Sequence, residues 1–148
     1  MKRFQFQLEP VLGYKQQRLD ALMTELSEAQ MVAAAQEKAR DEAFARLADY
    51  DAAFAEKRAA GFTNVEAIEY ESGQRVLEQR ARREQDLLER RRRELDAKRA
   101  EVTAARQETR VIERLRELRR GEYDAEAAKA EEKAIDDLTA ARRARAAG

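Results

Sequence analysis

The sequence predicts an all-α protein: an antiparallel two-helix coiled-coil hairpin with a longer, overhanging second helix. Three observations support this prediction. Ala, Glu, Lys, Leu and Arg dominate the 148 residues, with only one Pro and five Gly, a composition typical of long helices and coiled coils. Apolar residues recur every seven residues through most of the chain. A single strong helix break lies at residues 59–64.

The first helix is predicted over about residues 9–59. Pro10 suits its first turn, because the N–H that proline lacks has no partner at that position. Gly61 can end the helix in a left-handed conformation. Thr63 or Asn64 can then cap the N-terminus of the next helix.

The second helix is predicted over about residues 65–143, after a turn at about 60–64 and before a flexible tail at 144–148. A short connection between two long helices favours an antiparallel pair. We therefore expect a single coiled-coil hairpin domain that spans residues 1–148.

Heptad positions a and d define the expected seam between the helices. In the first helix, ten of 14 such positions are apolar or aromatic, and in the second helix nine of 14 are. The a series are Leu12, Leu19, Leu26, Ala33, Arg40, Leu47, Phe54 and Ala67, Gln74, Ala81, Leu88, Leu95, Val102, Thr109. The d series are Lys15, Leu22, Ala29, Gln36, Ala43, Tyr50, Lys57 and Tyr70, Leu77, Glu84, Arg91, Lys98, Ala105, Ile112. A sustained seven-residue repeat predicts a left-handed supercoil.

The two helices differ in length. At 1.5 Å per residue they would span roughly 75 Å and roughly 115–120 Å. If the chain folds about Gly61, residue 12 lies opposite about residue 110, and the segment beyond about 115 has no partner helix. Four large apolar side chains then stand on an unpaired surface: Leu115, Leu118, Ile135 and Leu138. The segment either binds another protein or frays.

Composition argues against enzymatic chemistry. The chain has no Cys and no His, which excludes ordinary zinc, haem and iron–sulfur sites and the commonest general base. It also contains no glycine-rich phosphate loop. Carboxylate pairs such as Asp136 and Asp137 are expected to be solvated surface charge. We expect no enzyme activity, no metal and no cofactor.

A basic cluster lies at residues 80–93. Seven arginines stand there against three acids, so phosphate binding deserves consideration. Consecutive arginines on a helix point in different directions, and no aromatic residue is nearby for base stacking. We expect a solvated face with the i,i+4 pairs Asp86–Arg90 and Glu89–Arg93, and no nucleic-acid binding. An acidic protein surface is an equally suitable partner.

The N-terminal segment alternates apolar and polar residues. Phe4, Phe6 and Leu8 alternate with basic or amide side chains. This alternation fits an extended arm or a strand added to a partner. It fits equally a local arrangement in which Phe4 and Phe6 fold onto the second helix, or onto the first helix near Tyr14.

Three segments resemble the FliJ family of bacterial flagellar type III export, and the resemblance covers essentially the whole chain. The N-terminal one reads Phe4-x-Phe6-x-Leu8-Glu9-x-Val11-Leu12-x-Tyr14. At the turn, Gly61-Phe62-Thr63 is followed by Ile68 and Tyr70. Near the C-terminus the chain reads Glu131-Glu132-Lys133-x-Ile135-Asp136-Asp137-Leu138.

The resemblance implies a non-enzymatic, two-helix stalk similar to the central stalk of rotary ATPases. Proteins of this family are thought to sit in the hexameric export ATPase (FliI-like), promote its assembly and activity, and link it to the membrane export gate (FlhA-like). Some bind export chaperones. The resemblance thus implies these three kinds of partner, and a cytoplasmic protein associated peripherally with the inner face of the cell membrane.

The resemblance also implies two sets of contact residues. The overhanging helix and the N-terminal end would enter the ATPase ring, through Phe4, Phe6, Leu8, Leu115, Leu118, Ile135 and Leu138. The export gate would contact the second helix just after the turn, along Gly73, Leu77, Arg80 and Glu84. Leu77 and Glu84 also belong to the predicted seam, so the two assignments compete.

Other functions remain open on sequence alone. One is the related injectisome stalk, and another is a generic coiled-coil scaffold or peripheral-stalk subunit. We find neither a signal peptide nor an apolar run long enough to insert into a membrane, so a cytoplasmic location is expected.

Overall fold

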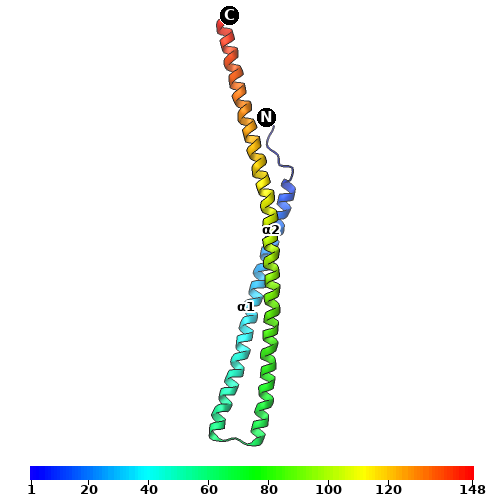
Figure 1. The fold of residues 1–148 in the computed structure, drawn as a ribbon, viewed down its shortest axis with the longest axis vertical. Coiled ribbons are helices and arrows are strands. Elements are labelled where there is room, and N and C mark those ends of the chain that lie inside the picture. The colour runs from blue at the N-terminus through cyan, green and yellow to red at the C-terminus, as the bar shows by residue number, and fades with distance from the viewer. The chain divides into compact units, whose positions relative to one another are not determined.

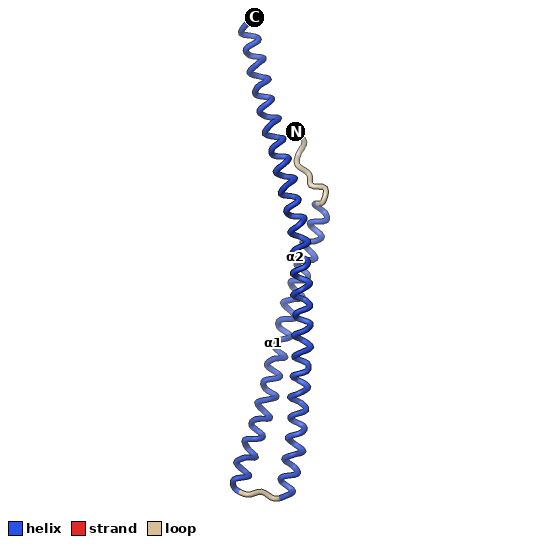
Figure 2. Tube along the Cα trace, in the orientation of Figure 1, coloured by secondary structure: helices blue, strands red, loops and turns tan.

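The computed structural model describes all 148 residues and contains two helices and no strands. Helix α1 spans Glu9–Ala60 and helix α2 spans Asn64–Ala147 (Figure 1). Residues outside the helices form the N-terminal arm, the turn and the C-terminal residue (Figure 2). The all-α hairpin prediction is confirmed. Helix α2 continues four residues past the expected end at 143, because the final Ala- and Arg-rich residues contain no helix breaker.

The turn forms as its residues predict. Gly61 has a φ of +104°, which L side chains rarely adopt, and its N–H donates to the Arg58 carbonyl at 3.3 Å. Thr63 caps α2, because its Oγ1 accepts from the Glu66 N–H at 3.2 Å. Its carbonyl also accepts the first backbone bond of α2, from Ala67 N at 3.1 Å.

The chain divides into two compact units. The terminal unit comprises Met1–Asp20 and Ala104–Gly148, and the turn unit comprises Ala21–Thr103. Both helices run through both units. A single domain over residues 1–148 therefore stays a prediction.

In the turn unit the helices pack antiparallel. Contacts between them pair Glu25 with Lys98 at 2.8 Å, Gln36 with Glu84, and Tyr50 with Tyr70. Residues with higher numbers on α1 contact residues with lower numbers on α2, as expected for an antiparallel pair. The buried residues of this seam are three alanines and four larger apolar residues: Ala33, Ala43, Ala81, Leu22, Leu88, Leu95 and Val102.

In the terminal unit the start of α1 also packs antiparallel to α2. Lys15 Nζ bonds Glu108 Oε2 at 2.9 Å, and Arg116 Nε bonds Glu9 Oε2 at 2.8 Å. Leu12 and Thr109 are the buried residues here, and the Thr109 hydroxyl donates to the Ala105 carbonyl at 2.8 Å. The partner expected for residue 12, near residue 110, agrees with these contacts.

The predicted register holds in both units. Every buried residue of the chain falls on a predicted a or d position. Of the 14 such positions on α1, only Lys57 is exposed, and none of the 14 on α2 is exposed. The heptad pattern thus identifies the face that each helix turns toward its neighbour.

Candidate interaction surfaces

The N-terminal arm, residues 1–8, lies against α2 in the terminal unit. The Phe4 and Tyr123 rings are 5.5 Å apart at an angle of 54°. The Arg120 guanidinium lies 5.1 Å from the Phe4 centroid and 5.7 Å from that of Tyr123, a cation–π arrangement. Tyr123 Oη donates to the Lys2 carbonyl at 2.5 Å. Of the alternatives that the sequence left open, the structure adopts docking onto the second helix.

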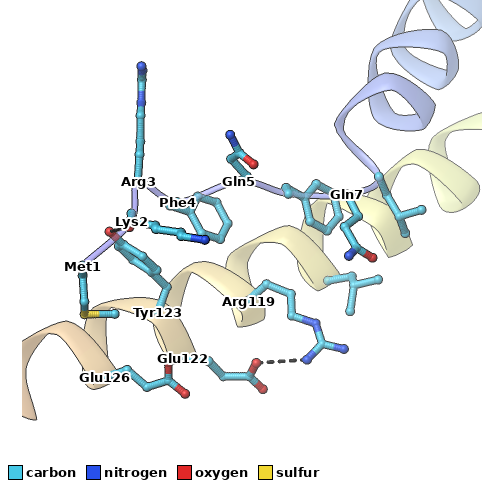
Figure 3. A pocket seen from close by; sticks show the side chains of 13 residues that line it. Met1, Lys2, Arg3, Phe4, Gln5, Gln7, Arg119, Glu122, Tyr123 and Glu126 are labelled. Atoms are coloured by element: carbon cyan, nitrogen blue, oxygen red, sulfur yellow. Dashed lines mark hydrogen bonds and ion pairs between the residues drawn. The ribbon is translucent and has the colours of Figure 1, made fainter.

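A cavity of about 640 Å³ lies between the arm and α2. In Figure 3 the Phe4 ring faces Tyr123, whereas Arg3 and Gln5 point away from α2. The walls are residues 1–8 of the arm and five residues of α2, namely Leu115, Arg119, Glu122, Tyr123 and Glu126. The ion pair between Arg119 and Glu122, at 3.1 Å, borders one side. The arm therefore leaves space for a side chain of another molecule next to its aromatic residues.

The seven residues expected to contact the ATPase fall into two groups. Phe4, Phe6, Leu8 and Leu115 gather around the arm cavity. The other three lie elsewhere on α2 and are strongly exposed: Leu118 at 66%, Ile135 at 56% and Leu138 at 62%. From residue 128 onward every residue of α2 is exposed, so this stretch has no intramolecular partner.

The four residues expected to contact the export gate do not form one exposed stripe. Leu77 and Glu84 are half-buried in the seam, and Glu84 accepts hydrogen bonds from Gln36 Nε2 at its side chain (2.5 Å) and its carbonyl (3.0 Å). Gly73 lies beneath the Tyr50 ring. Arg80 alone is exposed.

An aromatic cluster next to the turn was not singled out from the sequence. Tyr70 stacks on Phe54 at 3.7 Å and on Tyr50 at 5.2 Å, and Phe62 meets Phe54 edge-on at 5.5 Å. Three of these four rings occupy predicted a or d positions, so the heptad assignment contained the signal. Through this cluster Phe62 of the turn packs against α1, and α1 packs against α2.

A polar network borders this cluster. Tyr70 Oη donates to Asp51 Oδ1 at 2.5 Å, and Gln74 Nε2 donates to the same oxygen at 3.1 Å. The bond to Asp51, aided by partial burial, raises the pKa of Tyr70 to about 12. Tyr50 Oη donates to the Tyr70 carbonyl at 3.2 Å. All of these side chains have partners, which indicates a structural role for the network.

Charged pairs span the seam away from the turn. Lys98 Nζ bonds Glu25 at 2.8 Å and Glu101 at 3.2 Å, and these two carboxylates raise the pKa of Lys98. The expected pairs Asp86–Arg90 and Glu89–Arg93 are absent, which corrects the sequence-based prediction. Glu89 instead accepts a hydrogen bond from Gln85 at 3.3 Å.

Neither helix has a stretch long and apolar enough to cross a membrane.

One comparison with known proteins gives a match. The family model described as "Flagellar FliJ protein" matches residues 4–148. No curated protein and no solved structure matches the chain at a significant level. The match covers nearly all of the chain, from Phe4 in the arm through both helices and the turn.

Proposed function

Because the chain belongs to the FliJ family of flagellar proteins, we propose that it is a non-enzymatic stalk of the flagellar export machinery. In this role it binds the hexameric export ATPase, promotes assembly and hydrolysis by the hexamer, and couples the hexamer to the membrane export gate. It works in the cytoplasm, next to the inner face of the cell membrane. The flagellar description of the family favours this role over an injectisome stalk or a generic scaffold.

The observation that carries the ATPase contact is the unpartnered part of α2. Residues 128–147 form more than five helical turns with every side chain exposed, and two of these are Ile135 and Leu138. Large apolar side chains on a helix without an intramolecular neighbour are typical of a surface that binds another protein. We place the ATPase contact on this stretch and on Leu118, with the arm cavity as a second point of attachment.

The gate contact is proposed for the outward side of α2 after the turn. Arg80 is the member of the expected stripe that is free to reach a partner, and exposed Val76 lies four residues before it. Seam residues such as Leu77 would hold this part of α2 in place by packing against α1. Export chaperones are proposed as further partners of the chain.

The ATPase contact can be tested with purified proteins. The double variant Ile135→Glu/Leu138→Glu should abolish stimulation of ATP hydrolysis by the cognate export ATPase, because two carboxylates would replace the apolar contact. The matched control is Ala140→Glu/Ala144→Glu, which adds the same charge on the side of the helix opposite Ile135 and Leu138. Equal activity of both variants would refute the placement of the contact on Ile135 and Leu138. Failure of the unmodified chain to bind the ATPase would refute the stalk function itself.

A further inference from the structure

The C-terminal end of α2 carries three charges that no neighbouring side chain neutralises. Earlier on α2, arginines pair with an acid three or four residues away, as in Arg120–Asp124 at 3.2 Å. Glu131, Arg142 and Arg145 form no ion pair or hydrogen bond. None of the three has a side chain of opposite charge three or four positions away, where a helix could bring the two together. Their partners must therefore come from outside this helix.

The three charges share one strip of α2 with its two large apolar side chains. Successive residues turn about 100° around an α-helix, so positions spaced alternately by three and four residues lie on one face. This spacing defines what we call the C-terminal strip: Ala128, Glu131, Ile135, Leu138, Arg142 and Arg145. All of these residues are exposed, and Figure 1 shows this end of α2 extending past the N-terminus with no other segment beside it. Alanines at 127, 134 and 141 border the strip, and small side chains let a second helix approach closely.

The order of residues along the C-terminal strip is complementary to its own reverse. Consider a second copy of the strip that runs in the opposite direction, with Ile135 of each copy opposite Leu138 of the other. Glu131 of each copy then lies opposite Arg142 of the other. Two apolar layers form the centre of this arrangement, and an acid–arginine pair closes it at each end. A parallel arrangement would instead set Glu131 against Glu131 and Arg142 against Arg142, which repel.

We propose that the C-terminal strip pairs antiparallel with the C-terminal strip of a second copy of this chain. The interface has twofold symmetry, and a twofold interface requires a self-complementary patch of this kind. Its apolar centre and charged ends also match the usual anatomy of a protein–protein interface. The apolar residues supply the attraction, and the charged pairs fix the direction and register of the two helices.

The other charges of this stretch are compatible with the pairing. The lysines and Asp136 lie on the opposite side of α2, and Lys133 has acids three and four positions ahead of it. Glu132 and Arg143 lie on one flank of the C-terminal strip, where the antiparallel arrangement brings each close to the level of the other in the second copy. Asp137 lies on the other flank, at the solvent-exposed rim, where its repulsion from Asp137 of the second copy is screened.

The dimer also has a consequence for regulation, which rests on the proposed function. Ile135 and Leu138 carry the proposed ATPase contact, so one copy cannot hold a second copy and the ATPase at the same time. The dimer is then the resting form, in which these two side chains are covered, and the ATPase displaces one copy when it binds.

Sedimentation equilibrium of the full chain at low salt tests the pairing. The natural chain should show a concentration-dependent equilibrium between a 17.0 kDa monomer and a dimer. Glu131→Arg and Arg142→Glu should each weaken the dimer about tenfold, because each sets like charges opposite one another at both ends. The double variant Glu131→Arg/Arg142→Glu should restore the affinity of the natural chain, because the acid and the arginine have only exchanged places. In a parallel dimer none of the three variants would change the affinity, and that result would overturn the proposal.

Two matched controls make the same kinds of charge change on the opposite side of α2: Asp136→Arg and Lys133→Glu. Both should dimerise like the natural chain, and circular dichroism should show unchanged helicity for all variants. A natural chain that stays monomeric at about 1 mM would overturn the proposal. So would controls as defective as the single variants, or a double variant that stays monomeric.

Addition of the cognate export ATPase separates this dimer from the stalk function. The ATPase should convert the dimer to a complex with one copy of the chain, and a complex that retains the antiparallel dimer would overturn the resting-form assignment. A chain that dimerises as described but fails to bind the ATPase would refute the stalk function and leave the dimer standing.

Discussion

Gly73 stands inside a helix, where glycine normally lowers stability. The substitution Gly73→Ala tests whether the neighbouring Tyr50 ring is the reason for a glycine at this position. A Cβ built at Gly73 would lie 2.8 Å from Tyr50 Cζ and closer still to Tyr50 Oη. Such contacts are too short, so the tyrosine must move. Tyr50 is held by its bond to the Tyr70 carbonyl and by ring stacking, and both would be disturbed.

The expected magnitude follows from these contacts. Loss of the Tyr50 hydrogen bond costs about 0.5–1.5 kcal/mol. Loss of its stacking costs about 0.5–1.5 kcal/mol more. Ala recovers about 1 kcal/mol of helix propensity. The net change in the free energy of unfolding is thus a loss of about 1 kcal/mol. At Gly13 a Cβ meets nothing within 4 Å, so Gly13→Ala should give a gain of about 1 kcal/mol instead.

Urea unfolding followed by circular dichroism measures both substitutions. The decisive comparison is a double-mutant cycle with Tyr50→Ala. In that background Gly73→Ala should stabilise the protein by about 1 kcal/mol, because the obstructing ring is gone and only helix propensity remains. The reasoning is refuted if Gly73→Ala stabilises the natural chain as much as Gly13→Ala does.

Three further predictions concern single side chains. Tyr70 donates to Asp51 only while protonated, and its pKa rises from 10.0 to about 12 on folding. The stability contributed by this hydrogen bond is therefore complete below pH 10 and is lost as pH rises toward 12. Between these two pH values the melting temperature should depend less on pH for Tyr70→Phe than for the natural chain. Leu88 is fully buried, so Leu88→Ala should cost about 2–5 kcal/mol in urea unfolding, whereas Leu118→Ala, at a 66% exposed position, should change little. Tyr123→Ala removes the ring that holds Phe4, so cleavage of the arm by trypsin after Lys2 or Arg3 should accelerate while total helicity is kept. Unchanged cleavage would mean that the position of the arm does not depend on this contact.

The periodic features were predictable from the sequence, and the features that depend on individual cross-chain contacts were not. The register of the seam follows from apolar residues that repeat every seven positions, and Gly61 and Thr63 mark the turn by their local chemistry. The position of Tyr50 over Gly73 depends on how two distant segments meet, and no local pattern encodes that. Placing Leu77 and Glu84 on an outer stripe conflicted with the register, and the structure has both in the seam.

The arm shows a different limit. Alternation of Phe4, Phe6 and Leu8 with polar residues predicts one apolar edge, but it does not say which surface covers that edge. In the structure Tyr123 and Arg120 cover Phe4. Tyr123 lies two heptads after Thr109 in the a series, but the charged Arg116 interrupts the apolar repeat between them, and Arg120 is not apolar. A search for hydrophobic periodicity therefore passes over both.

The composition of residues 128–147 suits a helix that waits for a partner. Helices in proteins usually owe most of their stability to packing, and this stretch has none. Its many alanines and its arginines are strong helix formers, which favours helix formation without tertiary contacts. A segment that is already helical loses less conformational entropy on binding, so a modest apolar contact through Ile135 and Leu138 can suffice. A substitution such as Ala134→Gly should then weaken partner binding, although it leaves the contact residues unchanged. The control Ala134→Gln should bind the partner as well as the natural chain. Equal binding by both variants would show that the helix forms only on the partner.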